Sequence, residues 1–173
     1  PIVATRSWPL DGTEDGPGLE AAAAAEGARL LDEVISALLE GPLPSRAQES
    51  GGVSLSRPLH RSDGRLDPSR SAIELERRIR ALRPWPGTFL EVGGQRVVVH
   101  EGSVADPAPG DVRGSLVPHG DGIALATAEG RLVLETVQPA GGRSMPGSAF
   151  LRGHPSVAGS VVDPSPDDPG GRR

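Results

Sequence analysis

The spacing of apolar residues divides the chain into an N-terminal helical part and a C-terminal part in which apolar and polar residues alternate. Segment 19–41, LEAAAAAEGARLLDEVISALLEG, repeats leucine, valine and isoleucine at helical spacing and is rich in alanine, the best helix former. Gly41 followed by Pro42 is typical of a helix end. The pattern therefore predicts one long helix, preceded by a short strand over residues 2–10 that leads into an acidic, turn-rich loop.

A second helical pattern begins near Ser71. Ser71 and Glu74 have the spacing of a capping box, in which each residue's side chain accepts from the other's backbone N–H. One apolar stripe follows, formed by Ala72, Leu75, Ile79 and Leu82. The spacing of Glu74 with Arg78, and of Glu76 with Arg80, predicts two ion pairs of about 0.3 kcal/mol each along the helix surface.

The helical spacing ends at Pro84-Trp85-Pro86-Gly87. Pro84 cannot continue a helix, and Pro86-Gly87 favours a turn. We expect Trp85 to fill the seam between the helix and the structure that follows, burying roughly 150–250 Å² of surface. A role for Trp85 in stacking against a nucleobase is the alternative.

Alternating apolar and polar positions follow this corner. They predict five short strands, at residues 88–92, 95–101, 114–118, 122–128 and 131–137, with Gly93-Gly94 as a two-residue hairpin turn. Strands of this length and spacing favour a small barrel or sandwich, of which the OB-like barrel is one form. A short helix is predicted at 147–152 with Gly153 at its end, and residues 155–173 show no pattern, so we expect a disordered tail.

Composition supports a linker and excludes several kinds of protein. Gly and Pro together make up 42 of the 173 residues (24 and 18), which indicates long loops. Residues 41–70, rich in Pro, Gly, Ser and Arg, are therefore interpreted as a linker between two units. The chain has no cysteine, which excludes disulfides and cysteine zinc sites. Its apolar runs are too short to cross a bilayer, and no signal-peptide pattern is present.

The net charge of −5 is unevenly distributed. Residues 1–50 carry three arginines and nine acidic residues, whereas residues 51–100 carry nine arginines and five acidic residues. A basic middle in an acidic chain suggests contact with a polyanion. The alternative is that arginine is frequent only because it is the sole basic residue besides histidine, all 18 Lys and Arg positions being Arg.

Candidate catalytic groups are few. The four histidines are 40, 19 and 35 residues apart, so none pairs with another at metal-ligand spacing, and we expect no metal site. The chain contains no Gly-x-Ser-x-Gly motif and no phosphate-binding loop. The residues alone therefore predict a binding or supporting region without catalysis.

Two stretches resemble methionyl-tRNA formyltransferases. The first is LHRSDGRLDPSRSAIELERRIRALRPWPGTFLEVGGQRVVVHEGSV, residues 59–104, in which a helix, a Pro-Trp-Pro-Gly corner and a hairpin follow one another. The second is ATAEGRLVLETVQPAGGRSMPGSAFLRGH, residues 126–154, with the ending QPAG…FLRG. The upstream segment is similar to the end of the family's catalytic domain, so the resemblance covers about residues 1–154.

The resemblance implies an α+β chain. Residues 1–40 would be the end of a Rossmann-like formyltransferase domain, 41–70 a linker, 71–154 a C-terminal OB-like barrel, and 155–173 the tail. It implies a cytoplasmic, monomeric enzyme without metal that transfers a formyl group from 10-formyltetrahydrofolate to initiator methionyl-tRNA. The family's catalytic Asn, His and Asp would precede Pro1, so we expect upstream sequence and no activity from this chain alone.

The resemblance carries over a basic surface for the initiator tRNA, at Arg57, Arg61, Arg65, Arg70 and Arg143. The planar guanidinium can donate two hydrogen bonds to one phosphate. Five phosphate contacts would give a log–log salt slope of roughly −4. The alternative for Arg65 is a local ion pair with Asp63 or Asp67. The chain departs from the family at Pro68, where Trp is usual, and at Gly142, where Lys is frequent.

Two other functions remain open at this point. One is a formyltransferase of the same two-domain plan that acts on a sugar nucleotide or hydrolyses formyltetrahydrofolate, against which the QPAG…FLRG ending argues. The other is a non-catalytic RNA-binding module, against which the start at Pro1-Ile2-Val3-Ala4 argues, because it reads as the middle of a strand.

Overall fold

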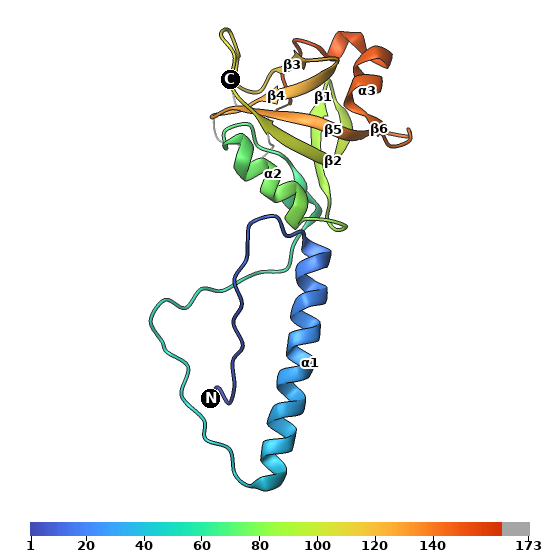
Figure 1. Ribbon diagram of the computed structural model, residues 1–173. Coiled ribbons are helices and arrows are strands. Elements are labelled where there is room, and N and C mark those ends of the chain that lie inside the picture. Colours follow the sequence, from blue (N-terminus) through green and yellow to red (C-terminus); the bar gives the residue numbers. More distant parts are fainter. Residues whose placement is uncertain (164–173) are drawn as a thin grey trace. The chain divides into compact units, whose positions relative to one another are not determined.

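The computed structural model describes residues 1–163 and divides into two units, Pro1–Pro58 and a second unit that begins at Leu59 (Figure 1). The fold is α+β, as expected, with a single antiparallel sheet in the second unit. No helix of residues 1–163 is long and apolar enough to cross a membrane.

The first unit consists of helix α1, Gly16–Glu40, and two extended segments. The Asp15 side chain caps α1 by accepting from the Gly18 N–H at 2.9 Å. The strand expected over residues 2–10 is wrong, because only Ile2 makes a bridge, to Arg46. None of the residues of α1 is buried, and its exposed large apolar side chains are Leu19, Leu31, Ile35, Leu38 and Leu39.

The second unit opens with a short 3-10 helix, Arg61–Gly64, and helix α2, Ala72–Ala81. The capping box of Ser71 and Glu74 is confirmed, since the side chain of each accepts from the backbone N–H of the other. The predicted apolar stripe is buried in full: Ala72, Leu75, Ile79 and Leu82. The sequence therefore specifies both where α2 begins and which face it buries.

The sheet contains the five predicted strands and one more. Their bounds are β1 Thr88–Val92, β2 Gln95–Ala105, β3 Leu116–His119, β4 Gly122–Ala126, β5 Arg131–Pro139 and β6 Met145–Pro146. The order is β1-β2-β5-β4-β3, with β6 paired to β5. The pairings of the described residues do not lead from β3 back to β1, so the OB-like barrel stays a prediction.

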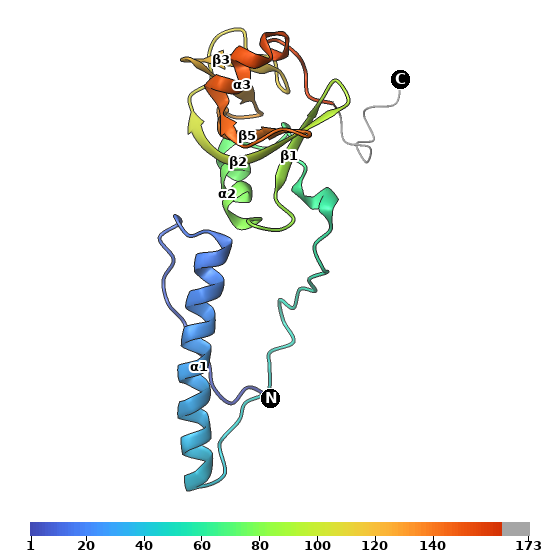
Figure 2. The same ribbon diagram turned by 90° about the vertical axis from the view of Figure 1, so that its right-hand side faces the viewer.

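The β1–β2 hairpin forms as expected around Gly93 and Gly94, both of which have positive φ (57° and 75°) as a tight two-residue turn requires. Its register points Leu90, Val97 and Val99 into the core. Figure 2 shows β2 curving along its length, and the ladder with β5 shifts register at Glu101.

Two helices pack on the sheet. Helix α2 contacts β2 and β5, whereas α3, Gly147–Gly153, contacts β4, β5 and β6 (Figure 1). The position of α3 agrees with the predicted helix at 147–152. Between these elements lies one hydrophobic core, whose fully buried large side chains include Leu66, Leu75, Ile79, Leu125, Leu132 and Leu134.

The expected disordered tail is wrong for residues 155–163. A 3-10 turn, Pro155–Val157, is followed by hydrogen bonds from the Leu116 N–H to the Ser160 carbonyl (2.8 Å) and from the Val162 N–H to the Gly114 carbonyl (2.8 Å). Val162 is buried. These backbone bonds extend the edge beside β3, which no local sequence pattern signals. The rest of the predicted tail lies outside the described residues.

The position of Trp85 also differs from expectation. The Gly87 N–H donates to the Leu82 carbonyl at 2.9 Å, and this closure leaves Trp85 at the outer part of the corner. Leu82 is buried, whereas Trp85 is 53% exposed. The indole therefore does not fill the seam between α2 and the sheet.

Candidate nucleic-acid interface

The five arginines predicted to bind tRNA are distributed over both units. Arg57 belongs to the first unit, where its guanidinium donates to the Pro58 carbonyl at 3.0 Å. The other four belong to the second unit. They differ in how many ion pairs and hydrogen bonds each guanidinium group forms within the fold.

Arg65 is the most enclosed of them. Its guanidinium forms an ion pair with Glu91 and donates to the Asp163 carbonyl at 3.0 Å. Burial, and after it the charge of Arg96, holds the pKa of Arg65 below its ordinary value. The alternative of an internal ion pair therefore applies to Arg65, although its partner is Glu91 rather than Asp63 or Asp67. Arg65 fixes the start of the unit against β1.

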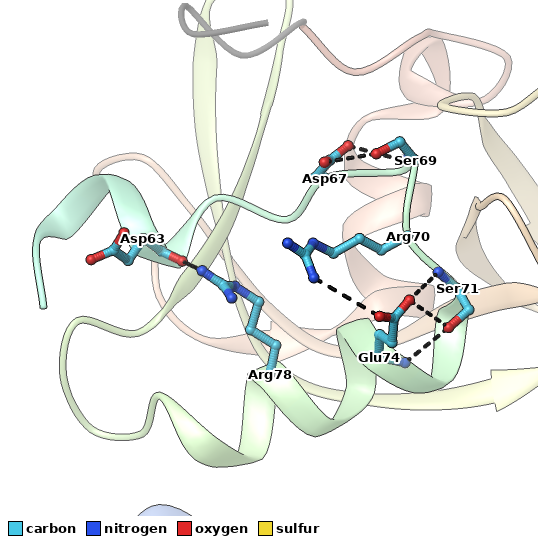
Figure 3. A network of polar contacts seen from close by, with 7 residues as sticks. All are labelled: Asp63, Asp67, Ser69, Arg70, Ser71, Glu74 and Arg78. Atoms are coloured by element: carbon cyan, nitrogen blue, oxygen red, sulfur yellow. Dashed lines mark hydrogen bonds and ion pairs between the residues drawn. The ribbon is translucent and has the colours of Figure 1, made fainter. Parts of the chain in front are cut away.

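Arg70 and Arg78 belong to a polar network around the start of α2, which Figure 3 shows. Arg70 pairs with Glu74 at 3.9 Å, and about half of its side chain stays exposed. Arg78 donates from Nε to the Asp63 carbonyl at 3.0 Å, so its predicted pairing with Glu74 is wrong. The predicted pair of Arg80 with Glu76 is confirmed at 2.6 Å. Much of the arginine density around α2 therefore stabilises the fold.

Arg61 and Arg143 are the remaining two arginines of the predicted set. Both are exposed, and neither makes an ion pair with another residue in the 163 that are described. Arg61 begins the 3-10 turn before β1, and Arg143 lies in the loop between β5 and β6. Exposed guanidinium groups of this kind can meet a phosphate without breaking an internal contact.

Arg96 lies beside both of these regions. It was not predicted from the sequence as a binding residue. In the hairpin register it faces Glu91, with which it forms an ion pair at 3.2 Å, and its guanidinium lies 3.9 Å from the centroid of the Phe89 ring. The Ala140 N–H donates to the Arg96 carbonyl at 3.1 Å, which brings the β5–β6 loop of Arg143 beside this strand. The signal available in the sequence was the hairpin register, which puts position 96 on the face opposite Val97.

A surface hollow of about 200 Å³ lies where Arg61, Arg96 and Trp85 meet. The remaining lining comes from the corner and the outer face of the hairpin, including Phe89 and Val98. Among residues 1–163, the two arginines are the only charged residues that line it. The hollow thus combines an exposed indole with two cationic groups.

The histidines do not form a metal centre within residues 1–163, where no group of three or more His, Asp or Glu side chains is placed to hold an ion. His100 Nε2 lies 3.1 Å from Gln138 Oε1, and the His154 ring packs on Phe150 at 4.9 Å between centroids. These two histidines have roles within the fold.

Comparison with known proteins defines the class to which this fold belongs. The family model described as "Formyl transferase, C-terminal domain" matches residues 58–155, which is more than half of the chain and begins at the boundary of the second unit. The chain belongs to this family.

The chain is similar to curated proteins named methionyl-tRNA formyltransferase. It is 39% identical over 162 residues to a methionyl-tRNA formyltransferase of Myxococcus xanthus, covering 92% of this chain and 51% of that protein. It is 38% identical over 162 residues to the methionyl-tRNA formyltransferase of Thermus thermophilus, with the same coverage. The chain spans about half the length of the curated relatives it matches.

Solved structures show the same fold at low sequence identity. HypX from Aquifex aeolicus, in a multiply substituted variant, matches with a TM-score of 0.58 and 16% identity, over 94% of this chain and 29% of that one. A HypX structure in complex with tetrahydrofolic acid matches with a TM-score of 0.57 and 15% identity, over 86% of this chain and 27% of that one.

Proposed function

We infer that the chain is the tRNA-docking part of a methionyl-tRNA formyltransferase. The parent enzyme would transfer the formyl group of 10-formyltetrahydrofolate to the amino group of initiator methionyl-tRNA, in the cytoplasm, as a monomer and without metal. The observation that carries this proposal is the family match over residues 58–155, together with relatives of that name at 38–39% identity. The chain would supply the docking surface, and the reacting groups would come from a preceding domain.

Helix α1 supports the assignment of residues 1–40 to the end of such a domain. It exposes a row of large apolar side chains, including Leu31, Ile35 and Leu38, although the helix is long and well capped. Apolar helix faces are normally buried against a second layer of structure. The sheet of a Rossmann-like domain would be such a layer.

In the second unit the docking surface would centre on Arg61, Arg96 and Arg143, with Arg70 contributing further charge. Arg57, in the first unit, would contribute a separate phosphate contact. Arg61 and Arg96 line one hollow, and the Arg143 loop is hydrogen-bonded to the strand that carries Arg96. Arg65 would act indirectly, since its guanidinium holds Glu91 and the Asp163 carbonyl. Each phosphate contact that is lost should reduce the salt slope by about 0.7–0.9.

The test is a titration of the full chain with initiator tRNA at several salt concentrations, with wild type compared with Arg61→Ser and Arg143→Ser. We expect each variant to weaken binding at low salt and to reduce the log–log slope by about 0.8. Arg77→Ser is the matched control, because Arg77 is also exposed but lies on α2, outside the proposed surface. If Arg77→Ser lost as much tRNA affinity as the other two variants, binding would depend on the total positive charge and not on the proposed surface. Unchanged affinity in all three variants would contradict the proposed surface.

A second measurement tests the proposal that this chain binds tRNA while the reacting groups lie in a preceding domain. The chain alone should form no formylmethionyl-tRNA when supplied with 10-formyltetrahydrofolate and methionyl-tRNA. Measurable formylation above the uncatalysed rate would refute the proposal that the reacting groups lie elsewhere.

A further inference from the structure

The exposed side chain of Trp85 needs a physical explanation. The chain has only four aromatic residues besides histidine, two Trp and two Phe, and both phenylalanines are buried. Trp85 is 53% exposed at a corner that is otherwise well ordered by hydrogen bonds. An exposed indole in a fixed position offers a flat face on which a ring can stack.

The corner that carries Trp85 is held on three sides. The Gly87 N–H donates to the Leu82 carbonyl at 2.9 Å, and the Thr88 hydroxyl donates to the Val99 carbonyl at 2.7 Å. Gly64 packs so closely against the corner that a Cβ there would overlap the Gly87 carbonyl oxygen. The indole is therefore displayed by a rigid support, which reduces the entropy lost when a ligand stacks on it.

The hollow beside Trp85 has the chemistry of a nucleotide site. Within the part of the chain that the structure describes, its charged lining consists of Arg61 and Arg96. Arg96 shares Glu91 with Arg65, so one carboxylate stands between two guanidinium groups. Bases of unpaired nucleotides stack on aromatic side chains, while nearby cations bind the adjoining phosphates.

We propose that Trp85 is a stacking platform for an unpaired nucleobase of the bound tRNA, with Arg61 and Arg96 binding the phosphates next to it. This inference rests on the proposed function, because it names one subsite of the same docking surface. The two arginines favour an anionic ligand, and the exposed face of the indole favours a nucleotide over an acidic peptide, because only the nucleotide adds a base that can stack. The base contact differs from the arginine contacts in one measurable way, since stacking releases few counterions.

The experiment measures both the affinity for tRNA and the slope of its dependence on salt. Loss of stacking lowers the affinity alone, whereas loss of a phosphate contact also lowers the slope. The Trp85→Leu and Trp85→Phe variants of the full chain are each titrated with initiator tRNA over a range of salt concentrations. We expect Trp85→Leu to weaken binding about tenfold at every salt concentration while the log–log slope stays unchanged. Trp85→Phe keeps an aromatic face and should lie between wild type and Trp85→Leu. Arg61→Ser should instead reduce the slope.

Fluorescence gives a second readout, because the chain has only two tryptophans. The Trp8→Phe variant leaves Trp85 as the sole indole, and its emission should be quenched as tRNA saturates the protein. The Trp85→Phe variant leaves Trp8 as the reference, whose emission should change little. Far-UV circular dichroism of each variant verifies that the fold is retained.

Two results would overturn the inference, and they are distinguishable. If wild type binds tRNA with a salt-dependent affinity and the Trp85 variants bind equally well, the stacking platform is wrong and the docking surface stands; the hollow then suits another ligand, such as a proline-rich peptide. If wild type does not bind tRNA at all, both the docking surface and the platform are wrong.

Discussion

Helices α1 and α2 have similar sequence patterns, but only α2 buries its apolar stripe. Both have a side-chain cap at the N-terminus and leucine and isoleucine at helical spacing. The apolar stripe of α2 is buried against the sheet, whereas α1 buries no residue at all. The second unit therefore contains its own hydrophobic core, and the first unit presents an apolar face without covering it.

This difference shows which part of the molecule should govern its stability. Burial of apolar surface is the main favourable term in folding, and only the second unit removes a large amount of such surface from water. The first unit depends on local helix propensity and a few ion pairs, such as Arg6 with Glu33 at 2.6 Å. Changes in α2 should therefore alter cooperative unfolding, and matched changes in α1 should not.

Truncation of one leucine in each helix tests the comparison with the largest expected effect. Leu75→Ala in α2 removes a fully buried side chain and should lower the free energy of unfolding by about 2–5 kcal/mol. Leu38→Ala in α1, where the side chain is exposed, should change it by less than about 0.5 kcal/mol. Urea unfolding followed by circular dichroism measures both. Equal losses would mean that the face of α1 is covered in solution.

Addition of one methyl group to a glycine in each unit should give effects of opposite sign. Gly64→Ala forces a Cβ into the Gly87 carbonyl oxygen and should destabilise the second unit by about 1–3 kcal/mol. Gly27→Ala in α1 brings the new Cβ within 4 Å of no atom beyond the backbone of its own helix, and it should stabilise the helix by about 0.5–1 kcal/mol. Helical ellipticity should rise for the second variant. A loss of stability in Gly27→Ala would mean that the surroundings of Gly27 in α1 are not open.

Removal of the two helix caps sharpens the comparison at a smaller scale. Ser71→Ala removes the oxygen that accepts from the Glu74 N–H, at a cost of about 1 kcal/mol in the cooperative unfolding of the second unit. Asp15→Ala removes the equivalent bond to the Gly18 N–H and should fray the start of α1, with no shift in that transition. A matching shift for Asp15→Ala would show that both helices unfold together.

Sequence reasoning succeeded where the controlling residues are close together. The cap of α2 is encoded by Ser71 and Glu74, and the hairpin by Gly93 and Gly94, so each can be read from a few residues. The buried stripe of α2 followed from helical periodicity. Local geometry and the apolar pattern therefore predict the elements and the α+β class.

Prediction failed where the partner is distant in sequence. Arg65 pairs with Glu91, 26 residues away, in preference to the neighbouring Asp63 and Asp67. The segment 155–163 is ordered through backbone bonds to the edge near Leu116, which leave no mark in its composition. Among the proposed site residues, Arg61 and Arg143 come from the resemblance and are exposed, whereas Arg96 becomes evident only from the hairpin register.

The smallest expected effect is confined to acidic pH and concerns one carboxyl group in the second unit. Hydrogen bonds, first from Arg131 (2.8 Å from Nε) and then from the Ala108 N–H, hold the pKa of Asp111 at about 2. Because this pKa lies below the ordinary value of about 3.9, the pair stabilises the fold at neutral pH, and this contribution is lost as the pH falls from about 4 to about 2.

Asp111→Asn removes that titration. The variant should be less stable than wild type at neutral pH, and the two stability curves should converge as the pH approaches about 2. In the first unit the pKa of Glu14 is also lowered, by backbone N–H groups of its own turn, first its own and then that of Asp11. Since that turn is local, Glu14→Gln should leave the acid unfolding of the second unit unchanged. A parallel pH dependence in wild type and Asp111→Asn would show that the Asp111–Arg131 pair does not stabilise the sheet.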